Sequence, residues 1–145
     1  RAETKDIHDD SYHFEWGKAE VLRQGSDVTI FATGIMTAKA LDAAETLAKQ
    51  GVQAEVINVH TIKPLDEETV IASAKKTGKV VTAEEHSIIG GLGSAVAEVL
   101  ARQCPTKQAF VGVQDSFGES GSPNDLLEKY GLTTEAIVKA AVGLQ

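Results

Sequence analysis

Short runs of apolar, largely β-branched residues alternate along this chain with segments whose apolar side chains recur at helical spacing. The runs lie at residues 27–33, 52–59, 79–83 and 109–113, and are nearly continuous in apolar character. Continuous runs are typical of strands covered on both faces, whereas a half-exposed strand alternates apolar and polar residues. The alternation predicts an α/β fold with a mostly parallel sheet, helices on both faces and right-handed crossovers.

The helical segments carry start and stop signals that agree with this pattern. We expect helices over residues 36–50, from Asp66 as N-cap to Gly78, from the glycines at 90–93 to a point before Pro105, and from Thr133 onward. The first has the stripe Ala40, Leu41, Ala44, Leu47 and Ala48, and the third has Leu92, Val96, Val99 and Leu100. Residues 19–24 predict a short extra strand, and Ser122 with Pro123 predicts a short additional helix.

Composition limits the classes of partner. The chain has 145 residues, 42% hydrophobic and 24% charged, which is typical of one globular domain. Its net charge of −7 argues against nucleic acid and against an anionic membrane surface, and no apolar run is long enough to span a bilayer. The single cysteine, Cys104, excludes an internal disulfide and favours the reducing cytoplasm.

The polar segment 1–17 is predicted to be a linker or arm from an upstream domain, and residues 18–145 to be the folded domain. The chain starts at Arg1, and its only methionine is Met36. We therefore expect it to be one domain of a larger protein.

Small and polar residues gather where the predicted strands end. In a parallel sheet these carboxyl ends share one rim, where ligands usually bind. The candidate rim site comprises Gly34, His60, Glu85, His86, Gly90, Gly91 and Gly93, with Glu84 and Asp115 nearby. Glycines that open a helix expose backbone N–H groups to an anion or phosphate, but they equally allow a tight turn and close packing of helix on sheet. Both interpretations stay open.

The rim histidines have two interpretations as well. His86 is a candidate acid–base group, or else a capping or interface residue. With one strand between them, the backbones of His60 and His86 would lie about 10 Å apart, which argues against a shared metal. No metal-ligand spacing and no G-x-S-x-G nucleophile motif is present in the sequence.

Several motifs together carry a family resemblance. In order, they are GKAEVLRQGSDVTIFATG, VINVHTIKPLD, VVTAEEHSIIGGLGSAVAEVL, DSFGESG and YGL. Over about residues 12–143 the chain resembles the carboxy-terminal domains of transketolases. The resemblance implies a three-layer α/β/α sandwich around a five-stranded mixed sheet, in the order 1-3-2-4-5, whose first strand is antiparallel. In that order the strand before Gly34 lies between those that lead to His60 and His86.

The resemblance also implies a function for the parent enzyme. Transketolases, in the pentose phosphate pathway, move a two-carbon ketol unit between sugar phosphates with thiamine diphosphate and Mg²⁺. The family binds cofactor and metal in other domains, so no catalytic, cofactor-binding or metal-binding residue is expected here. The implied partners are the upstream pyrimidine-binding and pyrophosphate-binding domains, and a second subunit in a homodimer. The implied role is assembly, with a regulatory ligand as an addition.

Two alternatives remain at this point. Deoxyxylulose phosphate synthase and the β subunits of 2-oxoacid dehydrogenases have related C-terminal domains, although EEHS and FGESG are more similar to transketolase. The second alternative is a small module that binds an anion or nucleotide through Gly34 and Gly90 to Gly93.

Overall fold

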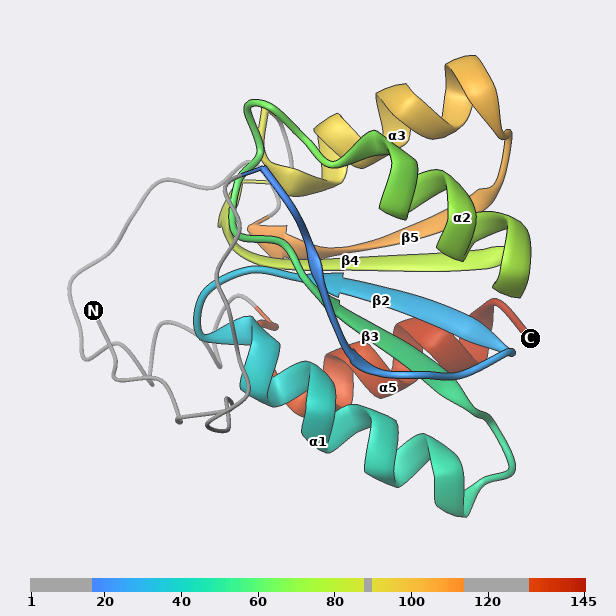
Figure 1. Ribbon diagram of the computed structural model, residues 1–145. Helices are drawn as coiled ribbons and strands as arrows, with labels where there is room; N and C mark the ends of the chain where they lie inside the picture. Colours follow the sequence, from blue (N-terminus) through green and yellow to red (C-terminus); the bar gives the residue numbers. More distant parts are fainter. Residues whose placement is uncertain (1–16, 88–89, 114–130) are drawn as a thin grey trace, which may run out of the picture.

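A single five-stranded sheet forms the centre of the molecule (Figure 1). The computed structural model describes residues 17–87, 90–113 and 131–145. The strands are β1 (Glu20–Arg23), β2 (Val28–Ala32), β3 (Ala54–Asn58), β4 (Lys79–Ser87) and β5 (Lys107–Val113). Their order is β1-β3-β2-β4-β5; β1 is antiparallel to β3, and the other neighbours are parallel. The predicted mixed sheet and its strand order are confirmed.

Helices cover the sheet on both faces and complete the predicted three layers. Helices α1 (Met36–Lys49) and α5 (Thr134–Gly143) lie on one face, and α2 (Glu67–Thr77) and α3 (Leu92–Gln103) on the other (Figure 1). Two apolar cores result, one under each helix pair. No helix within the described ranges is long and apolar enough to cross a membrane.

The central strands are buried on both faces, as their composition predicts. Every residue of β2 and β3 is buried. Ile30 and Val56 belong to the core under α1 and α5, whereas Phe31 and Ile57 belong to the core under α2 and α3. Burying each such side chain contributes about 1.5–3 kcal/mol. The sheet therefore holds both helical layers together.

The helix signals act as expected. The Asp66 carboxylate accepts a hydrogen bond from the Thr69 N–H, and α2 stops at Gly78, which has φ of 72°. The Thr133 hydroxyl accepts from the Ala136 N–H at the start of α5. These ends fix where each helix meets the sheet.

Strand β4 is longer than the sequence predicted. It runs to Ser87 rather than ending at Ala83, because pairing with β5 resumes at Ser87 and Val113 after a register shift. Glu84 and Glu85 therefore lie within a strand, not in a loop after it. The predicted helix at Ser122 and the rim position Asp115 lie outside the described residues.

Candidate functional site

The residues of the candidate rim site follow the carboxyl ends of the parallel strands. Gly34 follows β2 and has φ of 56°, which favours glycine at this turn into α1. His60 follows β3, and its Nε2 lies 3.9 Å from Glu20 Oε1 on the antiparallel edge strand. Because β2 lies between β3 and β4, Gly34 lies between the strand that leads to His60 and the one that carries Glu85. The side chain of His86 is outside the described part of the structure.

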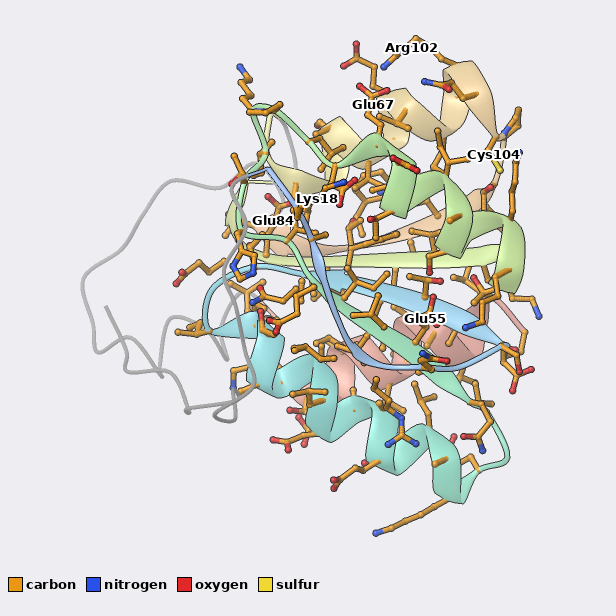
Figure 2. All side chains as sticks on the ribbon, in the orientation of Figure 1. Lys18, Glu55, Glu67, Glu84, Arg102 and Cys104 are labelled. Carbon is orange, nitrogen blue, oxygen red and sulfur yellow. The ribbon has the colours of Figure 1, made fainter. Side chains whose placement is uncertain are left out.

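A carboxylate of the chain itself occupies the start of α3. Glu84, on β4, is only 1% exposed. Its Oε1 accepts from the Leu92 N–H and its Oε2 from the Gly93 N–H, both at 2.8 Å. Figure 2 labels this side chain on β4. A negative charge here also interacts favourably with the helix dipole. Two amides that the sequence offered to an external anion therefore already have an anionic partner.

The sequence reasoning named Glu84 only as a neighbour and missed this role. The signal that could have found it is an acidic residue near the carboxyl end of the strand that precedes a glycine-opened helix. Such a side chain reaches the helix start directly, because the strand and the helix that follows it pack against each other.

The glycines around this helix start have separate structural roles. A Cβ added at Gly93 would lie 2.6 Å from the Phe110 ring, so the residue permits close packing of α3 on β5. Gly90 has φ of 79°, and its N–H donates to Ser94 Oγ at 3.0 Å. Both facts favour the interpretation of a tight turn and close packing. An external anion at this rim stays a prediction, and it would need donors other than Leu92 and Gly93.

A cavity of about 340 Å³ lies between α3 and the segment that leads into α2. Its wall combines the apolar Ile62, Leu65 and Val99 with the charged Lys63, Glu98 and Arg102. Glu67 also contributes to the wall, and its Oε2 lies 3.9 Å from the Arg102 guanidinium; both are labelled in Figure 2. The volume is within the range of small-molecule pockets, and both signs of charge are available.

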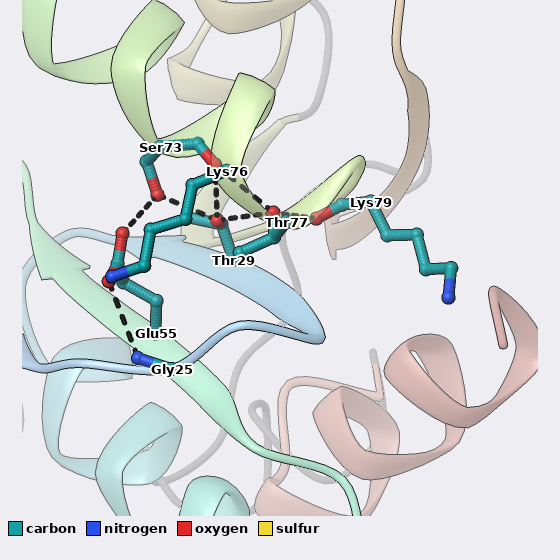
Figure 3. Close-up of polar contacts among 7 residues, drawn as sticks. All are labelled: Gly25, Thr29, Glu55, Ser73, Lys76, Thr77 and Lys79. Atoms are coloured by element: carbon teal, nitrogen blue, oxygen red, sulfur yellow. Dashed lines mark hydrogen bonds and ion pairs between the residues drawn. The ribbon is translucent and has the colours of Figure 1, made fainter.

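A buried polar network lies at the other end of the strands from the rim, where β2 and β3 begin (Figure 3). Glu55, 4% exposed, accepts from Lys76 Nζ and from Ser73 Oγ at 2.6 Å each, and from the Gly25 N–H at 3.3 Å. Burial raises the pKa of this carboxyl, but the bonds from Lys76, Ser73 and Gly25 outweigh burial and hold the pKa below its ordinary value. The network joins β3, α2 and the turn between β1 and β2.

Thr29 extends the network under α2. Its hydroxyl lies 2.7 Å from Ser73 Oγ and 2.8 Å from Thr77 Oγ1. These groups satisfy one another within the fold. The network is therefore a structural contact between sheet and helix, far along the strands from the rim.

Asp66 forms a second structural contact, between α2 and Ala19, the residue before β1. Besides capping α2, its Oδ2 accepts from the Ala19 N–H at 2.9 Å and from the Thr69 hydroxyl at 2.7 Å. Burial raises the pKa of Asp66, but these bonds, together with the charge of Lys18, hold the pKa below its ordinary value. Within the described ranges, no three His, Cys, Asp or Glu side chains are grouped so that they could hold a metal ion.

Comparison with known families accounts for this architecture. The family model for "Transketolase, C-terminal domain" matches residues 17–137. The chain belongs to the transketolase C-terminal domain family. The family that the sequence motifs indicated is thus confirmed.

Individual relatives agree with the family assignment. The chain is 60% identical over 135 residues to the 6-deoxy-6-sulfo-D-fructose transketolase subunit SqwH of Clostridium sp. (strain MSTE9), covering 93% of this chain and 42% of the relative. It is 45% identical over 127 residues to the 1-deoxy-D-xylulose-5-phosphate synthase of Desulforudis audaxviator (strain MP104C), covering 86% of this chain and 20% of that enzyme.

A solved structure supports the fold directly. The "Split gene transketolase, inactive beta4 tetramer" superposes with a TM-score of 0.94 and 51% identity, over 99% of this chain and 47% of the solved one. This transketolase C-terminal domain thus spans less than half the length of each of these three relatives.

Proposed function

We propose that this chain is the non-catalytic C-terminal domain of a transketolase, and that it serves assembly of the enzyme. The parent would transfer a two-carbon ketol unit between sugar phosphates, with thiamine diphosphate and Mg²⁺ bound by its other domains. The observation that carries the proposal is Glu84. At the glycine-rich helix start, where a substrate phosphate would be expected to bind, two amides are bonded to a buried carboxylate of the chain. The glycine-rich start of α3, which the sequence offered as a ligand site, therefore stabilises the packing of α3 on the sheet.

The relatives support a role alongside other domains or subunits. One is described as a transketolase subunit, and the solved relative is a split-gene transketolase in an inactive β4 tetramer. We propose that this domain combines with the pyrimidine-binding and pyrophosphate-binding domains of the same enzyme, as a homodimer in the parent. A related parent that makes deoxyxylulose phosphate is the alternative, given the 45% identity to that synthase. The single free cysteine, Cys104, supports a cytoplasmic location.

Reconstitution tests the proposal. The purified chain is mixed with a separately produced protein that carries the thiamine-binding domains, and ketol transfer from a ketose phosphate to an aldose phosphate is measured. We expect stable association, and activity in the mixture that is absent from the chain alone. Absence of association, together with no gain in ketol transfer, would contradict the proposal.

The cavity beside α3 supports a second, regulatory function. Lys63 and Arg102 provide cations for a phosphate, whereas Glu67 and Glu98 can accept hydrogen bonds from hydroxyls. This combination fits a phosphorylated polyol or a nucleotide. A neutral hydrocarbon ligand would make use of none of these four charged groups.

Calorimetric titration of the chain with sugar phosphates and nucleotides tests this second function. We expect binding that weakens about tenfold in Lys63→Ala, because a charge-assisted contact to phosphate is lost. Lys75→Ala is the matched control, since Lys75 is an exposed lysine on α2 that does not line the cavity. Silence at millimolar ligand would rule the function out.

A further inference from the structure

Glu67 and Arg102 form a loose ion pair in the wall of the cavity beside α3. The Arg102 guanidinium lies 3.9 Å from Glu67 Oε2, and the arginine and glutamate side chains are 54% and 45% exposed. The structural pair elsewhere in the domain is tight by comparison: Lys76 Nζ lies 2.6 Å from Glu55 Oε1, and that glutamate side chain is only 5% exposed. Exposed ion pairs contribute little to stability, so Arg102 can change its partner at low cost.

Glu67 keeps favourable contacts when Arg102 turns away from it. Its Oε1 accepts from the side-chain amide of Gln103 at 3.0 Å, and Gln103 does not line the cavity. Glu67 is also the first residue of α2, where a negative charge interacts favourably with the helix dipole. The release of Arg102 therefore leaves no carboxylate without a partner.

Arg102 makes little use of its hydrogen-bonding capacity in this pair. In the part of the chain that the structure describes, Glu67 is the only carboxylate that the guanidinium contacts. A guanidinium has five N–H donors in a planar fork, which can donate two parallel hydrogen bonds to a phosphate. A phosphate in the cavity is therefore a better partner for Arg102 than Glu67 is.

We propose that Arg102 exchanges partners, from Glu67 in the ligand-free cavity to the phosphate of a bound phosphate monoester. Gln103 holds Glu67 in both states, so Glu67 competes with the ligand for Arg102 from within the chain. Lys63 lines the same cavity and supplies a second positive charge. The inference rests on the proposed ligand-binding function of the cavity, and it names the residues that bind the phosphate and regulate its affinity.

The exchange predicts that removal of one charged cavity residue strengthens binding. Glu67→Gln keeps an oxygen that can accept from Gln103, but it removes the charge that competes for Arg102. We expect this variant to bind phosphate about three- to fivefold more tightly, which is the upper range for an exposed ion pair. Arg102→Gln should weaken binding at least about tenfold, because a charge-assisted contact to phosphate is lost.

The double variant distinguishes exchange from simple charge repulsion. If Glu67 acts by competing for Arg102, Glu67→Gln should change the affinity much less once Arg102→Gln is present. If Glu67 only repels the phosphate, the gain should be equal in both backgrounds.

Nuclear magnetic resonance titration of the isotope-labelled 145-residue chain with inorganic phosphate, at neutral pH and constant ionic strength, measures these affinities. The Arg102 Nε–H signal should shift as phosphate binds. Glu45→Gln is the matched control: it changes the net charge equally, at an exposed glutamate of α1 on the opposite face of the sheet, and should leave the affinity unchanged. Circular dichroism of every variant checks that the fold is kept.

The outcomes separate this inference from the cavity function on which it rests. If phosphate binds and Lys63→Ala weakens binding, but Glu67→Gln binds no more tightly than Glu45→Gln, the exchange is wrong and the cavity function stands. An equal gain from Glu67→Gln with and without Arg102 would also overturn the exchange. If neither inorganic phosphate nor sugar phosphates bind at millimolar concentration, the exchange and the cavity function are both wrong.

Discussion

Glu84→Gln should destabilise the domain more than the same carboxylate-to-amide substitution at any other described Asp or Glu. The carboxylate is 1% exposed and accepts from two backbone amides at 2.8 Å. Glutamine keeps one acceptor oxygen but sets an NH₂ group against the second amide. That amide of α3 is then buried without a partner, and the negative charge at the helix start is gone.

The magnitude follows from these two losses. A hydrogen bond to a charged group contributes about 1.5–3 kcal/mol, and a charge at a helix N-terminus about 0.3–1 kcal/mol. We therefore expect Glu84→Gln to lower the free energy of unfolding by about 2–4 kcal/mol. For a domain of this size, that corresponds to a fall in melting temperature of roughly 5–15 °C.

Urea unfolding followed by circular dichroism measures this loss, and amide hydrogen exchange locates it. Exchange at Leu92 and Gly93 should accelerate beyond the general increase. Glu98→Gln, at an exposed carboxylate later in α3, is the control and should change stability by less than about 0.5 kcal/mol. The reasoning is refuted if Glu84→Gln is as stable as that control and the two amides exchange at unchanged rates.

Three other substitutions test contacts away from the rim. Asp66→Ala should lower the free energy of unfolding by about 2 kcal/mol at neutral pH, because it removes the α2 cap and the acceptor for the Ala19 N–H. The pKa of Asp66 is lowered in the folded state, so its carboxylate contributes to stability above the unfolded pKa near 3.8, and this contribution is lost as pH falls through the folded pKa. The free energy of unfolding should therefore fall less steeply with acidification in the variant than in the unchanged chain. Gly25→Ala should lower the free energy of unfolding by about 3 kcal/mol, because the added Cβ would lie 2.3 Å from a backbone carbon of β3. The matched control is Gly143→Ala, whose Cβ would have nothing within 4 Å; thermal melting should show a gain in stability of about 0.5 kcal/mol. Lys76→Met should lower the free energy of unfolding by about 1–2 kcal/mol, since it leaves the buried Glu55 carboxylate without its ion-pair partner; the 44% exposure of the lysine side chain reduces the effect. If the two groups are coupled, Lys76→Met should cost less stability in a Glu55→Gln background than in the unchanged chain. An equal cost in both backgrounds would contradict the coupling.

The sequence predicted the elements well where apolar pattern and capping chemistry agree. Asp66, Gly78 and Thr133 mark helix ends because their side chains or backbone preferences act locally. The stripe of α1 was less accurate: Leu41 and Ala48 are only half-buried, while Thr37 and Ala43 are buried. The contact of α1 with α5 widens its buried face, and periodicity within one helix cannot reveal that neighbour.

The site was less predictable because it depends on contacts between distant residues. The glycines of the EEHSIIGGLG segment indicated free amides, and only the structure shows that Glu84 fills two of them. The extension of β4 past Ala83 depends on pairing with β5, which no local signal in the acidic residues indicated.

The most direct test of the central claim is a ketol-transfer assay of the purified 145-residue chain with saturating thiamine diphosphate, Mg²⁺ and sugar phosphates, alongside calorimetric titration of the cofactor. We expect no turnover and no cofactor binding until the thiamine-binding domains are added. Turnover by the chain alone, or tight binding of thiamine diphosphate within it, would contradict a non-catalytic role for this domain.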